Sequence, residues 1–125
     1  MDGKEFIEKF CRASGELDMK RIGAIITGCV NRCDDKYPQY EHGHMNIVST
    51  MEECAELIEA ISRRMRGRTD DNFEVMEEIG DVILSILCVA EIFGISHMDI
   101  RKAINVKMDR EAGRIEQHLK GIETQ

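Results

Sequence analysis

Two short acidic clusters carry the side chains of this chain that could do chemistry. One is Glu52-Glu53-Cys54-Ala55-Glu56, and the other is Glu78-Ile79-Gly80-Asp81. Carboxylates three residues apart on a helix share a face. Burying them together is costly, because like charges repel and desolvation disfavours the ionised form. A hard cation such as Mg²⁺ removes that cost, so two such pairs on two helices predict a four-carboxylate metal site.

The two clusters support each other. Taken alone, the glutamates of the first cluster would be explained by a solvated helix face. The second cluster directly precedes an almost uninterrupted apolar run, where acidic residues are unusual. Gly80 lies inside it, and a mid-helix glycine costs ~1 kcal/mol relative to alanine. We therefore expect another helix or a ligand to approach closely at Gly80.

The composition predicts one all-α globular domain over residues 1–125. Hydrophobic residues make up 42% of the chain and charged residues 33%, with a single proline. These fractions are typical of a folded helical protein of one domain. A net charge of −7 argues against a nucleic-acid polymer as partner, because its phosphates require a basic face. A small phosphorylated ligand remains compatible if metal ions supply the positive charge.

We expect a cytoplasmic protein without a membrane partner. The N-terminal Met-Asp-Gly-Lys-Glu-Phe has no basic region followed by an apolar stretch, as a secretory signal requires. No uncharged run reaches the roughly 20 residues that a membrane helix needs. The five cysteines form an odd count without a Cys-x-x-Cys pair, which favours reduced core thiols.

Apolar periodicity predicts four main helices joined by short connections, which is typical of a four-helix bundle. Their expected ranges are about 18–33, 45–66, 71–93 and 96–120, with a short extra N-terminal helix over 4–12 and one substantial loop over 34–43. In the second range, apolar residues at a 4-3-4-3-4 spacing predict a bundle seam formed by Ile47, Met51, Cys54, Ile58, Ile61 and Met65.

Capping signals and one unusual helix refine this picture. Gly67 is expected just beyond the end of the second helix, and Ser96 with Asp99 resembles a capping box for the last one. The helix over 71–93 is apolar on nearly every side in its second half. Such a helix must be buried all round, and a small bundle offers little room for that. We therefore expect a subunit interface, in a homodimer or a homotetramer.

Three motifs resemble, in order, those of the MazG-like, all-α nucleoside triphosphate pyrophosphohydrolases, and the resemblance covers about residues 45–114. They are Glu52-Glu53-Cys54-Ala55-Glu56-Leu57, then Glu77-Glu78-Ile79-Gly80-Asp81-Val82, then Ala103-Ile104-Asn105-Val106-Lys107 followed by Arg110. The resemblance implies a four-helix bundle of that type. It also implies Mg²⁺-dependent hydrolysis of a nucleoside triphosphate, a dNTP or a non-canonical NTP, to the monophosphate and pyrophosphate, as nucleotide-pool housekeeping.

The resemblance also implies roles for individual residues. The Mg²⁺ ligands, with Mn²⁺ as a substitute, are Glu53, Glu56, Glu78 and Asp81. Asn105, Lys107 and Arg110 bind the substrate. Either Glu52 or Glu77, each next to a ligand, could accept the proton from the attacking water, and we favour Glu52. On a helical projection Lys107 and Arg110 share one side with Arg114, as a phosphate-binding stripe requires. The arginines at 63, 64, 66 and 68 are interpreted as a complement to the helix macrodipole and a solubilising loop, with a phosphate contact as the alternative.

Two other classes of protein also have to be compared with this pattern of residues. A ferritin-like di-iron bundle also places glutamates in a helical core, but it calls for Glu-x-x-His on two helices, and neither acidic cluster contains that motif. The alternative that stays open is a non-catalytic, oligomeric helical module that binds a nucleotide or a partner through a MazG-like site. The presence of all four expected ligands favours the enzyme.

Overall fold

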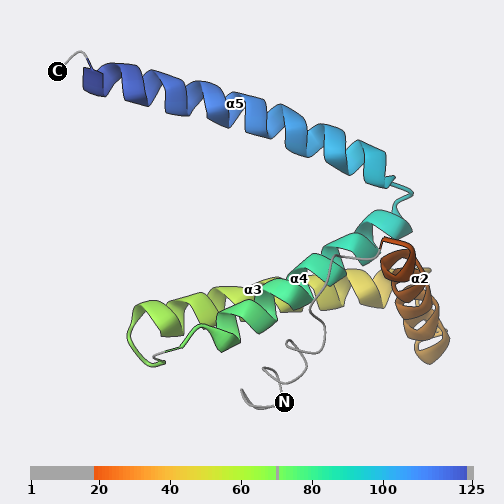
Figure 1. Cartoon of the computed structure of the whole chain (residues 1–125). Helices are drawn as coiled ribbons and strands as arrows, with labels where there is room; N and C mark the ends of the chain where they lie inside the picture. Colours follow the sequence, from red (N-terminus) through yellow and green to blue (C-terminus); the bar gives the residue numbers. More distant parts are fainter. Residues whose placement is uncertain (1–18, 70, 124–125) are drawn as a thin grey trace. The chain divides into compact units, whose positions relative to one another are not determined.

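The computed structural model describes residues 19–69 and 71–123, and within them the chain is helical without any strand. The four helices are α2 (Met19–Lys36), α3 (His44–Met65), α4 (Phe73–Ile92) and α5 (His97–Glu123), shown in Figure 1. The prediction of an all-α protein with four main helices is confirmed. The short helix expected over 4–12 lies outside the described residues. None of the helices in the described ranges is long and apolar enough to cross a membrane.

The predicted helix ends agree closely with the observed ones. Gly67, with φ of +70°, follows the end of α3 as expected. The capping box before α5 is present: the Asp99 N–H donates to Ser96 Oγ at 3.1 Å, and the Ser96 N–H donates to Asp99 Oδ2 at 3.4 Å. The main difference is at α2, which continues to Lys36, so the expected loop over 34–43 shortens to 37–43.

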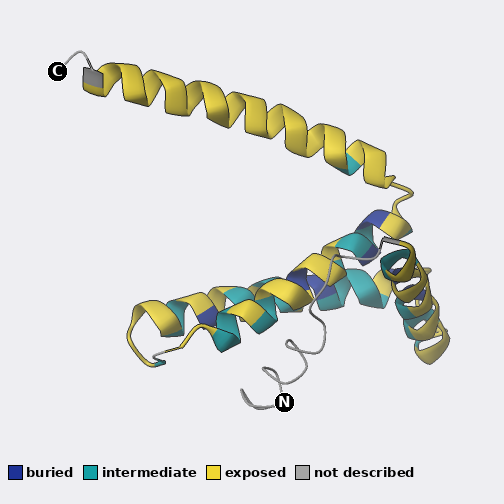
Figure 2. Ribbon diagram, viewed as in Figure 1, coloured by how far each residue is buried: buried dark blue, intermediate teal, exposed yellow. Residues whose placement is uncertain are grey.

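The chain divides into two compact units, one ending at residue 93 and the other beginning at residue 94. In the first unit α3 and α4 form a helical hairpin, and α2 packs against both. The second unit consists of α5, whose described residues are exposed except for the half-buried Ile100 (Figure 2). The bundle predicted from four helices therefore stays a prediction, while the packing of α2, α3 and α4 in the first unit is observed.

A small apolar core holds the first unit together. Ile26 and Val30 of α2 are buried against Cys88 of α4, with half-buried apolar neighbours around them. On α3 the buried residues are Thr50 and the fully buried Ala60, small side chains that let α4 approach closely. The predicted thiol in the core is thus confirmed for Cys88.

Among the described residues, most of the seam predicted on α3 is exposed, and only Ile47 and Cys54 are half-buried. Ile58 is 69% exposed and Met65 is 83% exposed, and Met51 and Ile61 are exposed as well. The helix turns a different face to α4, the one that carries Thr50 and Ala60. The 4-3 spacing correctly located an apolar stripe, but a stripe alone does not tell which partner covers it.

The start of α3 is fixed by a close contact and by two hydrogen bonds. Gly43 is buried with φ of +76°, and a Cβ there would lie 2.5 Å from Cγ2 of Ile92. Asp34 Oδ1 accepts the Gly43 N–H at 2.8 Å, and its Oδ2 pairs with His42 Nδ1 at 2.5 Å. These two bonds lower the pKa of Asp34, the bond from Gly43 most of all. The N-terminus of α3 is thereby tied to both α2 and α4.

Candidate metal centre

The register of the α3–α4 hairpin determines which side chains face each other. Near the turn, Arg63 pairs with Glu59 on its own helix at 2.5 Å and with Glu74 on α4. Further along, the Thr50 hydroxyl lies 3.3 Å from the Ser85 carbonyl oxygen. Both cross-helix pairs indicate that α3 and α4 run antiparallel. For two residues that face each other, the residue numbers therefore add to nearly the same value along the hairpin. Glu53 therefore lies opposite Asp81.

Three carboxylates meet at this level of the hairpin. Glu53 from α3 and Glu78 and Asp81 from α4 each offer one oxygen, and these oxygens lie within 4.8 Å of one another. Oε2 of Glu53 and Oε2 of Glu78 are buried and have no hydrogen-bond partner within the described part of the chain. Buried acceptors without partners are costly, and a hard cation would satisfy them with oxygen ligands of the kind that Mg²⁺ prefers. The donor set fits a divalent metal ion.

The electrostatics of the cluster agree with this geometry. Burial, followed by repulsion from Glu56, Asp81 and Glu78, raises the pKa of Glu53 from 4.5 to about 7. Burial is also the first cause that raises the pKa of Glu78 and that of Asp81, and the charge of Glu56 contributes to both. The folded chain thus holds negative charge in a place where it is disfavoured without a cation.

The fourth expected ligand stands slightly apart. Glu56 is exposed on the next turn of α3 and is not part of the group within 4.8 Å, although its charge acts on all three members. Glu52, the expected base, is exposed on the same helix. The close approach of another helix expected at Gly80 is not seen among the described residues, since a Cβ there would meet nothing within 4 Å, and the approach of a ligand stays a prediction.

A cavity of about 320 Å³ between α2, α3 and α4 adjoins the carboxylates. Its lining residues are Cys29, Arg32 and Cys33 of α2, Asn46, Ser49 and Glu53 of α3, and Asp81, Leu84, Ser85 and Cys88 of α4. The volume is at the lower end of the range for ligand pockets. Two members of the carboxylate group, Glu53 and Asp81, form part of the wall. A ligand in the cavity can therefore contact a metal ion held by the cluster.

Two residues of this wall were missed by the sequence analysis. Arg32 is the cation of the cavity wall and makes no ion pair within the described residues. Asn46 lines the same wall, and its Oδ1 is buried without a partner. Asn46 could have been found from its spacing, because it precedes Glu53 by seven residues and so shares its helix face. No sequence signal points to Arg32, because only tertiary packing brings α2 to the site.

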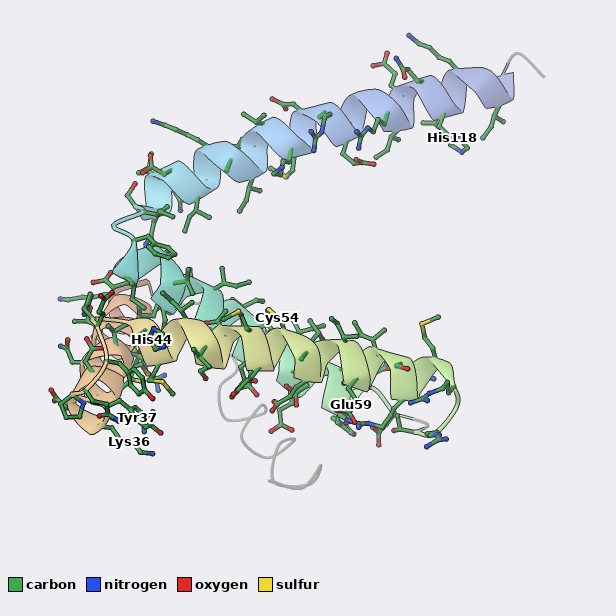
Figure 3. All side chains as sticks on the ribbon, turned by 180° about the vertical axis from the view of Figure 1, so that it is seen from behind. Lys36, Tyr37, His44, Cys54, Glu59 and His118 are labelled. Atoms are coloured by element: carbon green, nitrogen blue, oxygen red, sulfur yellow. The ribbon has the colours of Figure 1, made fainter. Side chains whose placement is uncertain are left out.

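The other predicted residues occupy different surroundings. Asn105, Lys107 and Arg110 are exposed on α5, in the second unit. The arginines in the last turn of α3 serve the hairpin turn, where Arg63 bridges Glu59 and Glu74 and Arg64 donates to Asn72 Oδ1 at 3.0 Å. Aromatic side chains lie close together where α2 ends and α3 begins, in the region where Figure 3 labels Lys36, Tyr37 and His44. There the rings of Tyr40 and His44 stack at 4.9 Å.

The fold and the site define a class of protein: an all-α domain whose helical hairpin gathers carboxylates beside a cavity, suited to metal-assisted chemistry on phosphates. The family model described as the MazG nucleotide pyrophosphohydrolase domain matches residues 42–114. The chain belongs to this family, whose members hydrolyse anhydride bonds of nucleoside triphosphates and are typically metal-dependent. The resemblance carried by the three motifs is thus confirmed. No curated protein and no solved structure matches the chain.

Proposed function

We propose that the chain hydrolyses a nucleoside triphosphate, a dNTP or a non-canonical NTP, to the monophosphate and pyrophosphate in the presence of Mg²⁺. The observation that carries this proposal is the group formed by Glu53, Glu78 and Asp81, with oxygens within 4.8 Å of one another at the wall of a cavity. Membership of the MazG family supplies the reaction class. Removal of non-canonical nucleotides from the pool is the physiological role that this reaction suits.

The carboxylates have separate tasks in the proposed mechanism. Glu53, Glu78 and Asp81, with Glu56 from the next turn, hold the metal. When bound, Mg²⁺ supplies positive charge to the phosphate oxygens and a site where water is oriented, and Mn²⁺ can replace it. Glu52 accepts a proton from the water that attacks the α-phosphorus, because it adjoins a ligand yet is exposed and free of the cluster. Glu77 is the competing candidate for the base.

Cations of the chain contact the triphosphate in this proposal. Lys107 and Arg110 of α5 lie one turn apart and share a helix face, so they can contact adjacent phosphates, and Asn105 assists them. Arg32 of the cavity wall is a further candidate, because it has no ion-pair partner within the described residues. Replacing Arg110 by alanine should raise KM for the triphosphate more than it lowers kcat, since a phosphate contact contributes mainly to binding.

Pyrophosphate release tests the reaction. Canonical and modified dNTPs and NTPs are incubated with the protein and Mg²⁺ in water enriched in ¹⁸O. The products are separated by chromatography, and their masses are measured by mass spectrometry. We expect the label in the monophosphate, because water attacks the α-phosphorus. Asp81→Asn should abolish turnover, while Glu91→Gln, which removes an exposed carboxylate of α4 outside the cluster, should leave it intact. Absence of turnover with every nucleotide, combined with Mg²⁺-dependent nucleotide binding, would favour the non-catalytic module instead.

A separate comparison identifies the base. Glu52→Gln should lower kcat while the affinity for Mn²⁺ stays unchanged, because Glu52 is a base in this scheme and no ligand. Glu77→Gln is the matched variant on α4. If Glu77→Gln lowers kcat and Glu52→Gln does not, the roles of the two residues are exchanged.

We also propose that the chain works as a homodimer or a homotetramer. Large apolar side chains remain exposed on α3 and α4, including Ile58 at 69% and Ile83 at 54%. Large exposed apolar side chains that gather into one patch mark an interface between proteins. The mass in solution, measured by light scattering, should be a multiple of 14.3 kDa. Ile83→Glu should reduce it, and a monomeric wild-type protein would refute the proposal.

A further inference from the structure

The cavity wall contains a polar group that the proposed chemistry does not use. Asn46 lines the cavity, and its Oδ1 is sealed from solvent without a hydrogen-bond partner in the described part of the chain. Buried polar groups are nearly always paired, and one that is not calls for an explanation. No hydrogen bond holds the side-chain amide among the described residues, so it can turn about its last torsion toward a ligand.

The backbone around Asn46 is firmly held. Three residues earlier, Gly43 donates its N–H to Asp34 and packs against Ile92. One turn later, the Thr50 hydroxyl donates to the Asn46 carbonyl oxygen at 2.8 Å. A recognition residue needs a fixed backbone so that its side chain meets the ligand in one geometry. Asn46 meets this condition.

The hairpin register divides the cavity wall into three levels. Glu53 and Asp81 form the first level, and Ser49 and Ser85 lie one turn away on their respective helices. One further turn along, Asn46 of α3 lies at the level of Cys88 of α4. Because α3 and α4 are antiparallel, moving back along α3 corresponds to moving forward along α4. Along the cavity, the side chains of the wall therefore change from the carboxylates of the first level, through the serine hydroxyls of the second, to the amide of Asn46 at the third.

The length of this wall matches a nucleotide. Asn46 and Glu53 are seven residues apart, which is two turns and about 10 Å along the helix axis. A nucleotide whose α-phosphate is held at the carboxylates extends its sugar past the second level and brings its base to the third. In this arrangement the sugar, which is bonded directly to the α-phosphate, lies nearer the second level than the third.

We propose that Asn46 recognises the base of the substrate through hydrogen bonds from its side-chain amide to the Watson–Crick edge. This inference rests on the proposed function and adds the residue that sets its base preference. An amide presents an acceptor and two donors side by side, which complements the neighbouring donor and acceptor of a base edge. The thiols and Leu84 of the remaining wall suit the faces of the ring.

The test compares base preference with metal binding. kcat/KM is measured for dATP, dGTP, dCTP and dUTP with wild type, Asn46→Ala and Asn46→Asp. Asn31→Ala serves as the matched control, because Asn31 is an exposed asparagine of α2 outside the cavity wall. Binding of Mn²⁺ to each protein is measured by electron paramagnetic resonance, and circular dichroism checks that each variant is folded.

We expect Asn46→Ala to lower kcat/KM for the preferred base about tenfold or more, chiefly through KM, and to compress the ratio between bases. Asn46→Asp keeps the shape of the side chain but loses both N–H donors, so it should also compress the ratio of kcat/KM between bases. If Asn46→Ala does not fold, Asn46→Asp alone tests whether Asn46 recognises the base. Mn²⁺ affinity should stay at the wild-type value in both. The control should keep the wild-type ratio.

Distinct outcomes overturn the inference and the proposed function. If wild type hydrolyses nucleotides but the base ratios of both Asn46 variants stay within about twofold of wild type, Asn46 does not read the base and the proposed function stands. A loss of Mn²⁺ affinity equal to the loss of activity would assign Asn46 a structural role instead. If wild type hydrolyses no nucleotide, both proposals fall.

Discussion

Replacing Glu53 by glutamine should stabilise the metal-free protein while removing its ability to hold a metal ion. Glu53 is half-buried, and its carboxylate oxygen lies within 4.8 Å of those of Glu78 and Asp81. Burial, followed by the charge of Glu56 and its neighbours, raises the pKa of Glu53 from 4.5 to about 7. Glutamine keeps the shape of the side chain and removes its charge.

The sign and size of the effect follow from the pKa. At a pH below 4.5 the carboxyl group is protonated in the folded and the unfolded chain alike, so its removal changes little. Between 4.5 and about 7 only the unfolded chain releases the proton, so rising pH favours unfolding. Above about 7 the penalty is complete. The difference between the pKa of Glu53 in the folded and in the unfolded chain corresponds to a loss of about 3 kcal/mol in the free energy of unfolding. Screening by solvent at this partly exposed group reduces that loss to roughly 1–2 kcal/mol.

Urea unfolding in the presence of a chelator measures this effect. At about pH 8 the urea midpoint of Glu53→Gln should lie above that of wild type, and its free energy of unfolding should be higher by roughly 1–2 kcal/mol. At about pH 4 the unfolding curves of the two proteins should nearly coincide. Saturating Mg²⁺ should reverse the order, because only wild type gains from metal binding. Protein concentration is kept constant, and Glu91→Gln is the control. The reasoning is refuted if Glu53→Gln is the less stable protein at pH 8 without metal, or if its gain persists unchanged at pH 4.

Three further predictions concern the supports of the site. Gly43→Ala should lower the free energy of unfolding by roughly 2–4 kcal/mol, because a side chain is strained at this φ and clashes with α4, whereas Gly28→Ala in open space on α2 should be neutral or stabilising in the same urea titration. Thr50→Val should lower the free energy of unfolding by about 1 kcal/mol, because the hydroxyl loses its hydrogen bonds, whereas Thr27→Val at an exposed site should change it very little. Equal losses in the two variants would contradict the role of the Thr50 hydroxyl. Alkylation of Cys33, followed by peptide mass spectrometry, should be slowed by a bound nucleotide, and an unchanged rate would place the nucleotide outside the cavity.

The helices and the acidic group were predictable because both depend on local patterns. The capping pair Ser96 and Asp99 and the glycine at 67 determine helix ends through bonds that span one turn or less. The carboxylates of Glu53, Glu78 and Asp81 lie on helix faces that the sequence spacing defines, so their convergence followed once the two helices were paired. In these cases local chemistry and tertiary structure agree.

The remaining features depend on packing between distant segments, which periodicity does not encode. The apolar stripe of α3 that includes Ile58 and Met65 was expected to face a neighbour in the chain, yet the small residues Thr50 and Ala60 form the contact with α4. A helix or a ligand was expected close to Gly80, and no other described segment of the chain lies within 4 Å of a Cβ built there. Arg32 reaches the cavity wall only because α2 packs beside the hairpin.

The antiparallel hairpin also has a kinetic consequence. Only the connection over 66–72 separates α3 from α4, so closing the hairpin costs little loop entropy, and such local contacts are typical of rapid folding. The carboxylates of Glu53, Glu78 and Asp81 come together in that same event. Their repulsion therefore opposes an early step of folding, whereas Arg63, bound to glutamates of both helices, assists it at the turn. A divalent cation should accordingly increase the refolding rate in stopped-flow experiments, in addition to slowing unfolding.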